Sequence, residues 1–155
     1  MPAFVCGMRL GHTQHRTITM PSFLNPPTVP TPGSRYSQAV ALGTPFKRLI
    51  ISGQIGARPD GAMEEGLEAQ LERAWDNVLA LLDAAGMTIA DLVKVNTYVT
   101  PKNSVGLTRL VRERKIGRHA PASTYVEVAG LANPIWLCEI EAEAVREVSA
   151  GPTKA

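Results

Sequence analysis

The sequence predicts an α+β domain in which two helices cover one face of a sheet. Over residues 64–85, apolar residues repeat at three- and four-residue steps, which is the pattern of an amphipathic helix. Over 93–99 and 136–145, side chains alternate between two faces, as in strands with one buried face. The chain of 155 residues suits one domain with a core. Two helices are too few to cover both faces of the sheet, so we expect both on one face.

Two short strands are predicted at the start of the domain, over 36–42 and 46–55, with Gly43 and Pro45 between them. The second run is apolar and β-branched, which favours a strand. Gly53 lies inside this run. A glycine within a strand indicates a bulge or a close approach to the backbone.

Capping signals follow the long helix. Gly86 suits the position just after its C-terminus, and Thr88–Asp91 has the form of a capping box that opens one short helical turn. A second, weaker helix is predicted over 104–116. We expect its apolar residues Leu107, Leu110 and Val111 to face inward and its charged residues Arg109, Arg112 and Glu113 to face mostly outward.

Two strands complete the domain, over 122–128 and 136–145. In the last strand, three glutamates share the face that the helices do not cover: Glu139, Glu141 and Glu143. Such a face is either wet or covered by a partner subunit, and tyrosines predicted on the same face favour the second interpretation. The domain is expected over 35–148, followed by a flexible C-terminal tail over 149–155.

Residues 1–34 are predicted to form an extended or disordered N-terminal arm. Five prolines over 20–34 remove amide donors and disfavour a helix or a central strand. A targeting peptide or a secretory signal fits the first 19 residues poorly, because they are neither amphipathic nor continuously apolar. We expect these residues to be a dispensable extension ahead of a start at Met20.

The charges are distributed unevenly along the chain. Residues 1–62 hold six basic residues and one acid, Asp60, whereas 63–155 carry a net charge of −3. The overall formal charge of +2 predicts no obligate nucleic-acid partner. RNA binding by the arm is a weak alternative, because its arginines are sparse and no aromatic residues are interleaved with them.

The cysteines and the hydropathy exclude several further classes. Cys6 and Cys138 alone cannot form a disulfide framework or a four-ligand zinc site, and Cys138 lies in an apolar run typical of a buried core residue. No run reaches the roughly 18 apolar residues of a membrane span. We therefore expect a protein of a reducing compartment, the cytoplasm, without a metal, a cofactor or a membrane partner.

Several of these segments occur in an order and spacing that resemble the Rid family, the YjgF-like reactive-intermediate deaminases, over about residues 35–146. The matching segments are Tyr36–Val40 (YSQAV), Ile51–Ile55 (ISGQI), the long helix into Ala84–Gly86, Asp91–Val95 (DLVKV), Pro121–Val128 (PASTYVEV) and Glu139–Ala142 (EIEA).

The resemblance implies a chorismate-mutase-like fold with a mixed six-stranded sheet and two helices on one face. It implies a homotrimer whose sheets face inward, with a small-molecule cleft at each subunit boundary. Many relatives hydrolyse 2-imino or enamine acids to a 2-keto acid and ammonia, without a metal or an organic cofactor. The same deaminase-type hydrolysis of a small enamine or imine metabolite is therefore expected here.

One residue departs from the pattern of the active deaminases. In those relatives an arginine follows the Pro-Ala of this segment and anchors the substrate carboxylate, whereas Ser123 stands at that position here. We expect the loss to alter the substrate. Arg109 or Arg35 could replace the anchor, and each could equally be a solvated surface arginine.

The resemblance implies further site residues. Glu139 matches the cleft glutamate of the family and would position or deprotonate the attacking water. Tyr36 would close the cleft, Gly53 would let the ligand approach the backbone, and Thr124 would offer a hydroxyl beside Ser123. Each residue also has a purely structural interpretation. The alternative function is a trimeric protein that binds a small metabolite without hydrolysing it.

Overall fold

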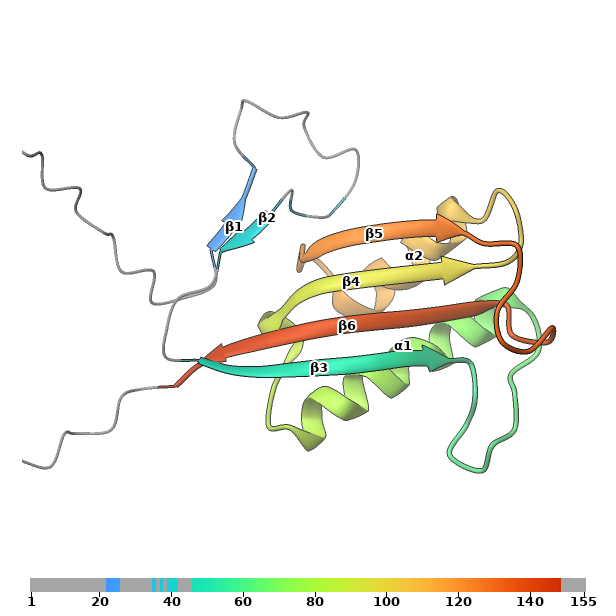
Figure 1. Cartoon of the computed structure of the whole chain (residues 1–155), viewed down its shortest axis with the longest axis horizontal. Helices are drawn as coiled ribbons and strands as arrows, with labels where there is room; N and C mark the ends of the chain where they lie inside the picture. Colours follow the sequence, from blue (N-terminus) through green and yellow to red (C-terminus); the bar gives the residue numbers. More distant parts are fainter. Residues whose placement is uncertain (1–21, 26–34, 36, 38, 42–45, 149–155) are drawn as a thin grey trace, which may run out of the picture.

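A four-stranded mixed sheet forms the body of the protein. The computed structural model describes residues 22–25, 35, 37, 39–41 and 46–148. The strand order is β3-β6-β4-β5 (Figure 1), with β3 and β4 antiparallel to β6 and with β5 parallel to β4. The strands are β3 (Phe46–Ile55), β4 (Leu92–Val99), β5 (Ala122–Glu127) and β6 (Cys138–Glu147). All four lie where the sequence predicts strands, with ends that differ by one or two residues.

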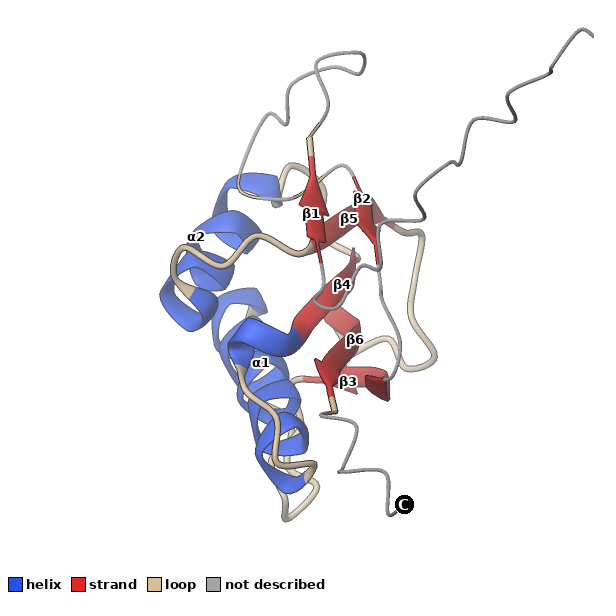
Figure 2. Cartoon of the chain, turned by 90° about the vertical axis from the view of Figure 1, so that its left-hand side faces the viewer, coloured by secondary structure: helices blue, strands red, loops and turns tan. Residues whose placement is uncertain are grey.

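Both long helices lie on the same side of this sheet (Figure 2), as predicted. They are α1 (Leu67–Ala84) and α2 (Val105–Ile116), and the short 3₁₀ turn η1 (Ile89–Asp91) precedes β4. Helix α2 makes the crossover that a parallel β4–β5 pair requires. Within the described ranges, no helix combines the length and the apolar character needed to cross a membrane.

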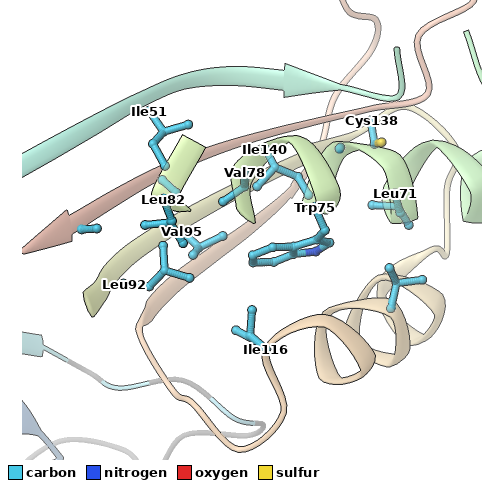
Figure 3. Close-up of a cluster of buried hydrophobic side chains, with 14 of the residues drawn as sticks. Ile51, Leu71, Trp75, Val78, Leu82, Leu92, Val95, Ile116, Cys138 and Ile140 are labelled. Atoms are coloured by element: carbon cyan, nitrogen blue, oxygen red, sulfur yellow. The ribbon is translucent and has the colours of Figure 1, made fainter. Parts of the chain in front are cut away.

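The core fills the space between the helices and the sheet. Trp75, which has no exposed surface, belongs to one buried cluster that joins α1 to the strands (Figure 3). On β6, Cys138 and Ile140 are buried while the intervening residues are partly exposed, so the alternation predicted for this strand is confirmed. We call the side toward α1 and α2 the helix-covered face and the other side the open face.

The described strands do not form the single six-stranded sheet that the resemblance implies. Two further strands, β1 (Ser22–Leu24) and β2 (Ala39–Ala41), pair antiparallel with each other in a separate two-stranded sheet. Strand β1 falls in the arm that was expected to be extended or disordered. Four prolines lie between the two strands, and proline cannot donate to a ladder, which is consistent with pairing limited to three residues per strand. The predicted tail 149–155 lies outside the described residues.

The predicted capping box at Thr88 and Asp91 is present and is tied to the sheet. The Asp91 carboxylate accepts hydrogen bonds from the backbone N–H of Thr88 at 2.6 Å and from Arg146 Nη2 on β6 at 2.5 Å. Arg146 also donates to the carbonyl of Gly86, just after α1. Burial alone would raise the pKa of Asp91, but the hydrogen bonds from Arg146 and Thr88 outweigh it and lower this pKa below its ordinary value of 3.8.

We expect Asp91→Asn to lower the free energy of unfolding by about 1 kcal/mol at neutral pH, because the capping carboxylate and its ion pair are both lost. A lowered pKa means that this contribution is complete above the unfolded pKa of about 4 and disappears as the pH falls through the folded pKa. Urea unfolding at pH 7 and pH 3 measures the change. Asp83→Asn, on the exposed side of α1, is the control, and equal losses in the two variants would contradict the assignment.

Candidate functional site

A cavity of about 390 Å³ lies on the helix-covered face, between α2 and the edge strand β5. We call it the edge cavity. Its walls carry two guanidinium groups, several hydroxyl groups and no acidic side chain. The lining residues are Thr97, Val105, Thr108, Arg109, Arg112, Ser123, Thr124 and Tyr125. The cavity therefore suits a small ligand that is negatively charged or rich in hydrogen-bond acceptors.

Arg112 is a buried residue of the edge cavity, and the prediction that it faces outward is wrong. Only 8% of the residue is exposed, and its Nη1 donates to the Ser123 hydroxyl at 3.1 Å. Burial, and next the nearby charge of Arg109, lower the pKa of Arg112, but a guanidinium remains protonated in proteins. A charged fork thus stands directly beside Ser123, the position at which the resemblance predicts a lost arginine.

Three of the predicted binding residues meet at this cavity. Ser123, Thr124 and Arg109 all line it, although the Thr124 hydroxyl is engaged by Lys94 Nζ at 2.8 Å. Arg109 is exposed. Arg35, the other candidate for the missing anchor, does not line the cavity; its Nη1 donates to the carbonyl of Gly117 at 3.1 Å.

Hydrogen bonds at one end of the cavity join β5 to the start of α2. The Tyr125 hydroxyl donates to Glu127 at 2.9 Å, and the same carboxylate oxygen accepts the backbone N–H of Ser104, the residue before α2. Burial and the carboxylate of Glu127 raise the pKa of Tyr125 to about 12. Tyr125 is thus a neutral donor that helps to fix the position of α2 relative to β5.

On the open face, the three glutamates of β6 differ in their partners. Glu141 accepts hydrogen bonds from Asn96 and Tyr98, and Glu143 pairs with Arg48 at 2.6 Å. By contrast, no described residue donates a hydrogen bond to the carboxylate of Glu139 or forms an ion pair with it. Two of the glutamates are therefore held by the sheet, whereas the carboxylate of Glu139 has no partner among the described residues.

Glu139 lies against Gly53 of β3. A Cβ atom on Gly53 would come within 1.7 Å of Glu139 Oε1, so any larger residue here would force the Glu139 side chain to move. The β3–β6 register also shifts between Ile51 and Gln54, which fits the irregularity that a glycine within a strand predicts, while the approach of a ligand at Gly53 stays a prediction. The close neighbour is a side chain from the adjacent strand.

A buried glutamine fixes the chain just before Glu139. The side-chain amide of Gln70 on α1 donates to the carbonyl of Ile135 at 2.9 Å, and its oxygen accepts the N–H of Leu137 at 2.8 Å. Gln70 is only 2% exposed. These bonds hold the segment that enters β6, and so they help to set the position of the Glu139 carboxylate.

We expect Gly53→Ala to lower kcat/KM by between about tenfold and a hundredfold, because the new methyl group displaces the Glu139 carboxylate. Steady-state kinetics with an imine substrate generated in solution measure the change. Gly106→Ala is the matched control, since a Cβ at that position meets no atom within 4 Å. Unchanged kinetics in a folded Gly53→Ala variant would show that the contact between Gly53 and Glu139 plays no part in activity.

The predicted site residues thus fall into two groups. Ser123, Thr124 and Arg109 border the edge cavity, whereas Gly53 on β3 and Glu139 on β6 lie together at least two strands away from β5 and do not line it. Tyr36 lies outside the described residues. Sequence reasoning missed the roles of Arg112, Thr108 and Gln70. A signal for the first two was available: Thr108, Arg112 and the buried Ile116 are spaced by four residues and share one side of α2.

The Cys138 thiol and the possible metal ligands do not add to the candidate site. Cys138 is buried, as predicted, and burial raises the pKa of its thiol to about 12. Among the residues that the structure describes, no group of three or more histidine, cysteine or acidic side chains could hold a metal ion.

The fold and its side chains define a small α+β protein with a candidate ligand site at one edge of a mixed sheet. A family model described as Endoribonuclease L-PSP matches residues 27–146. The chain is 37% identical over 115 residues to a 2-iminobutanoate/2-iminopropanoate deaminase of Salmonella typhimurium; the match covers 72% of this chain and 87% of that protein.

Solved structures agree with this relationship. A Rid-family protein of unknown function from Yersinia pestis superposes with a TM-score of 0.70 at 30% identity, covering 80% of this chain and 97% of that one. Escherichia coli TdcF, solved with bound serine, gives a TM-score of 0.60 at 30% identity, covering 83% of this chain and 94% of that one. The chain belongs to the Rid (YjgF-like) family, as its sequence motifs indicated.

Proposed function

We propose that this protein hydrolyses the C–N bond of a small imine or enamine metabolite, in clefts formed between copies of the chain. The relatives named as 2-iminobutanoate/2-iminopropanoate deaminases give the reaction type. The observation that carries the proposal is the Glu139 carboxylate, which lies against Gly53 without a partner among the described residues, while the neighbouring Glu141 and Glu143 are both engaged. We place the activity in the cytoplasm, as predicted from the sequence.

The chemistry needs a base near the carbon that water attacks. A protonated imine, C=NH₂⁺, takes water at carbon as Glu139 accepts one proton from that water, which gives a carbinolamine. Glu139 then returns the proton to the amine nitrogen. The C–N bond then breaks and ammonia leaves, while the hydroxyl oxygen gives its proton to Glu139 as it becomes a carbonyl, and Glu139 releases that proton to solvent. An enamine first requires a proton at carbon to form the same iminium.

The two groups of site residues support a cleft shared between subunits. Ser123 borders the helix-covered edge cavity, whereas Glu139 alternates with the buried Cys138 and Ile140 and therefore faces the open side. One chain thus presents two half-sites on opposite faces of its sheet. A homotrimer in which β5 of one copy meets the open face of the next would bring them together.

Ser123 is expected to change which substrate this cleft accepts. A serine hydroxyl is neutral and short, so it cannot make the bidentate contact with a carboxylate that an arginine makes at this position in the active deaminases. The same substitution is the specific observation behind a second candidate function, a trimer that binds a small metabolite without hydrolysing it. The structure of TdcF with bound serine supports the capacity of a relative to hold such a ligand.

RNA cleavage, which the family description names, finds less support in the described side chains. Base-catalysed attack by a ribose hydroxyl needs a general base and a general acid near a phosphate. The one described histidine, His119, has its Nε2 2.7 Å from the carbonyl of Leu92, and its ring packs edge-on against Phe23. The open face presents glutamates, which repel phosphate.

A lyase-coupled assay tests the proposal. A pyridoxal-dependent lyase generates 2-iminobutanoate or 2-iminopropanoate in solution, and keto-acid release is followed with and without this protein. We expect faster release with the native chain and no acceleration by Glu139→Gln. A protein that binds these acids yet accelerates none of them would favour the binding function. Light scattering of the native chain tests the trimer, which a monomer would rule out.

A further inference from the structure

Arg112 is a buried positive charge without an acidic partner among the described residues. Its exposed fraction is 8%, and no described carboxylate lies within 4.0 Å of its guanidinium. Nη1 donates to Ser123, but Nη2 is buried without a hydrogen-bond partner in the part of the chain that the structure describes. An unpaired charge removed from water is costly, so native proteins pair such a charge or use it to bind an anion.

A second unpartnered polar atom lines the same cavity. Thr108 lies one helical turn before Arg112 and is 6% exposed, and its hydroxyl has no hydrogen-bond partner within the described ranges. Arg109 adds a second positive charge to the lining, which includes no acid. The volume of about 390 Å³ is in the range of small-molecule sites. Both residues that carry these unused donors line the cavity, and the positive charge of its walls suits a small anion.

Ser123 gives this arrangement its geometry. The Ser123 hydroxyl, on β5, accepts a hydrogen bond from Arg112 Nη1, on α2, at 3.1 Å. This bond fixes the orientation of the guanidinium between α2 and β5. A long side chain at position 123 would compete for the space that the Arg112 fork occupies. The serine therefore acts as a positioning residue for an arginine that comes from the helix.

We propose that Arg112 binds the carboxylate of the ligand, with Thr108 as a second donor and Ser123 as the residue that positions the fork. The inference rests on the proposed function, because the carboxylate is that of the imine or enamine acid. It also narrows that function. The loss of arginine at position 123 has moved the anchor from the strand to the helix, and the substrate remains a small carboxylic acid.

Ligand binding by the full-length protein tests this inference without turnover. Isothermal titration calorimetry compares 2-oxobutanoate, the stable keto acid, with 2-oxobutanamide, its neutral counterpart. We expect native protein to bind the acid at least tenfold more tightly than the amide. Arg112→Gln should weaken binding of the acid by between about tenfold and a hundredfold and leave the amide unaffected. Arg114→Gln, which loses only surface ion pairs with Glu68 and Glu72, is the matched control.

The possible outcomes separate this inference from the proposed function. Equal affinity of native protein for acid and amide, or no binding of short 2-oxo acids at millimolar concentration, would overturn the inference even if Arg112→Gln failed to fold. The same holds if Arg112→Gln bound the acid like native protein. Acid binding that depends on Arg112 without imine hydrolysis would support the inference and refute the proposed reaction. Imine hydrolysis with an unchanged KM in Arg112→Gln would support the proposed reaction and refute the inference about Arg112.

Discussion

We expect Glu139→Gln to lower kcat for imine hydrolysis by a factor of about 10² to 10⁴, the usual contribution of a general base. Glutamine keeps the shape of the side chain and still fits beside Gly53, but it cannot take a proton from the attacking water. Affinity for 2-oxobutanoate should change little. This keto acid is the product of hydrolysis and already contains the oxygen that water supplies, so its binding needs no proton transfer to Glu139. Steady-state kinetics and calorimetry of the same preparation measure the two effects.

Glu143→Gln is the matched control for this prediction. The residue lies on the same face of β6, four positions further along, and its carboxylate is already paired with Arg48. Its loss should leave kcat within a factor of about two, because an exposed ion pair contributes little. Equal activity of the two variants would remove Glu139 from the mechanism, and a loss confined to KM would assign it to binding alone.

Most elements of the fold could be predicted because their sequence patterns are strong. The period of α1 arises from residues such as Leu71, Trp75 and Val78, which are all fully buried, so apolar spacing and burial agree. The capping box at Thr88 depends on contacts within four residues and is equally local. The pairing of β1 with β2 could not be foreseen, because it joins two three-residue strands across a proline-rich segment that carries no periodicity.

The candidate site was only partly predictable, and α2 shows why. The apolar pattern predicted that Leu110 would face inward and Arg112 outward, yet Leu110 is 51% exposed and Arg112 is buried. Patterning assumes that buried positions are apolar, and this assumption fails where a helix lines a polar cavity. The resemblance indicated Ser123 as the altered position, which stays a prediction. The contact between Arg112 and Ser123 could be seen only in the α2–β5 packing, which joins these residues eleven positions apart.

The proposed move of the carboxylate-binding arginine from β5 to α2 leads to a prediction about a double variant. Arg112→Gln alone should weaken 2-oxobutanoate binding by between about tenfold and a hundredfold. Adding Ser123→Arg to Arg112→Gln returns a guanidinium to the same cavity, now from β5, and we expect affinity to recover to within about tenfold of native. Calorimetry with 2-oxobutanoate and 2-oxobutanamide shows whether the recovered affinity belongs to the carboxylate.

The single variant Ser123→Arg shows whether recovered binding in the double variant comes from replacing Arg112 or only from adding a positive charge to the cavity. Arg112 would lose its acceptor, and two guanidinium groups would share one buried space, where like charges repel strongly. We therefore expect this single variant to bind the acid no better than native protein and to unfold at a lower temperature. A single variant that binds more tightly than native would show that the two positions act additively. A folded double variant that binds as weakly as Arg112→Gln would show that an arginine at position 123 cannot replace Arg112. Either outcome would contradict the idea that a single guanidinium, supplied by α2 or by β5, binds the carboxylate.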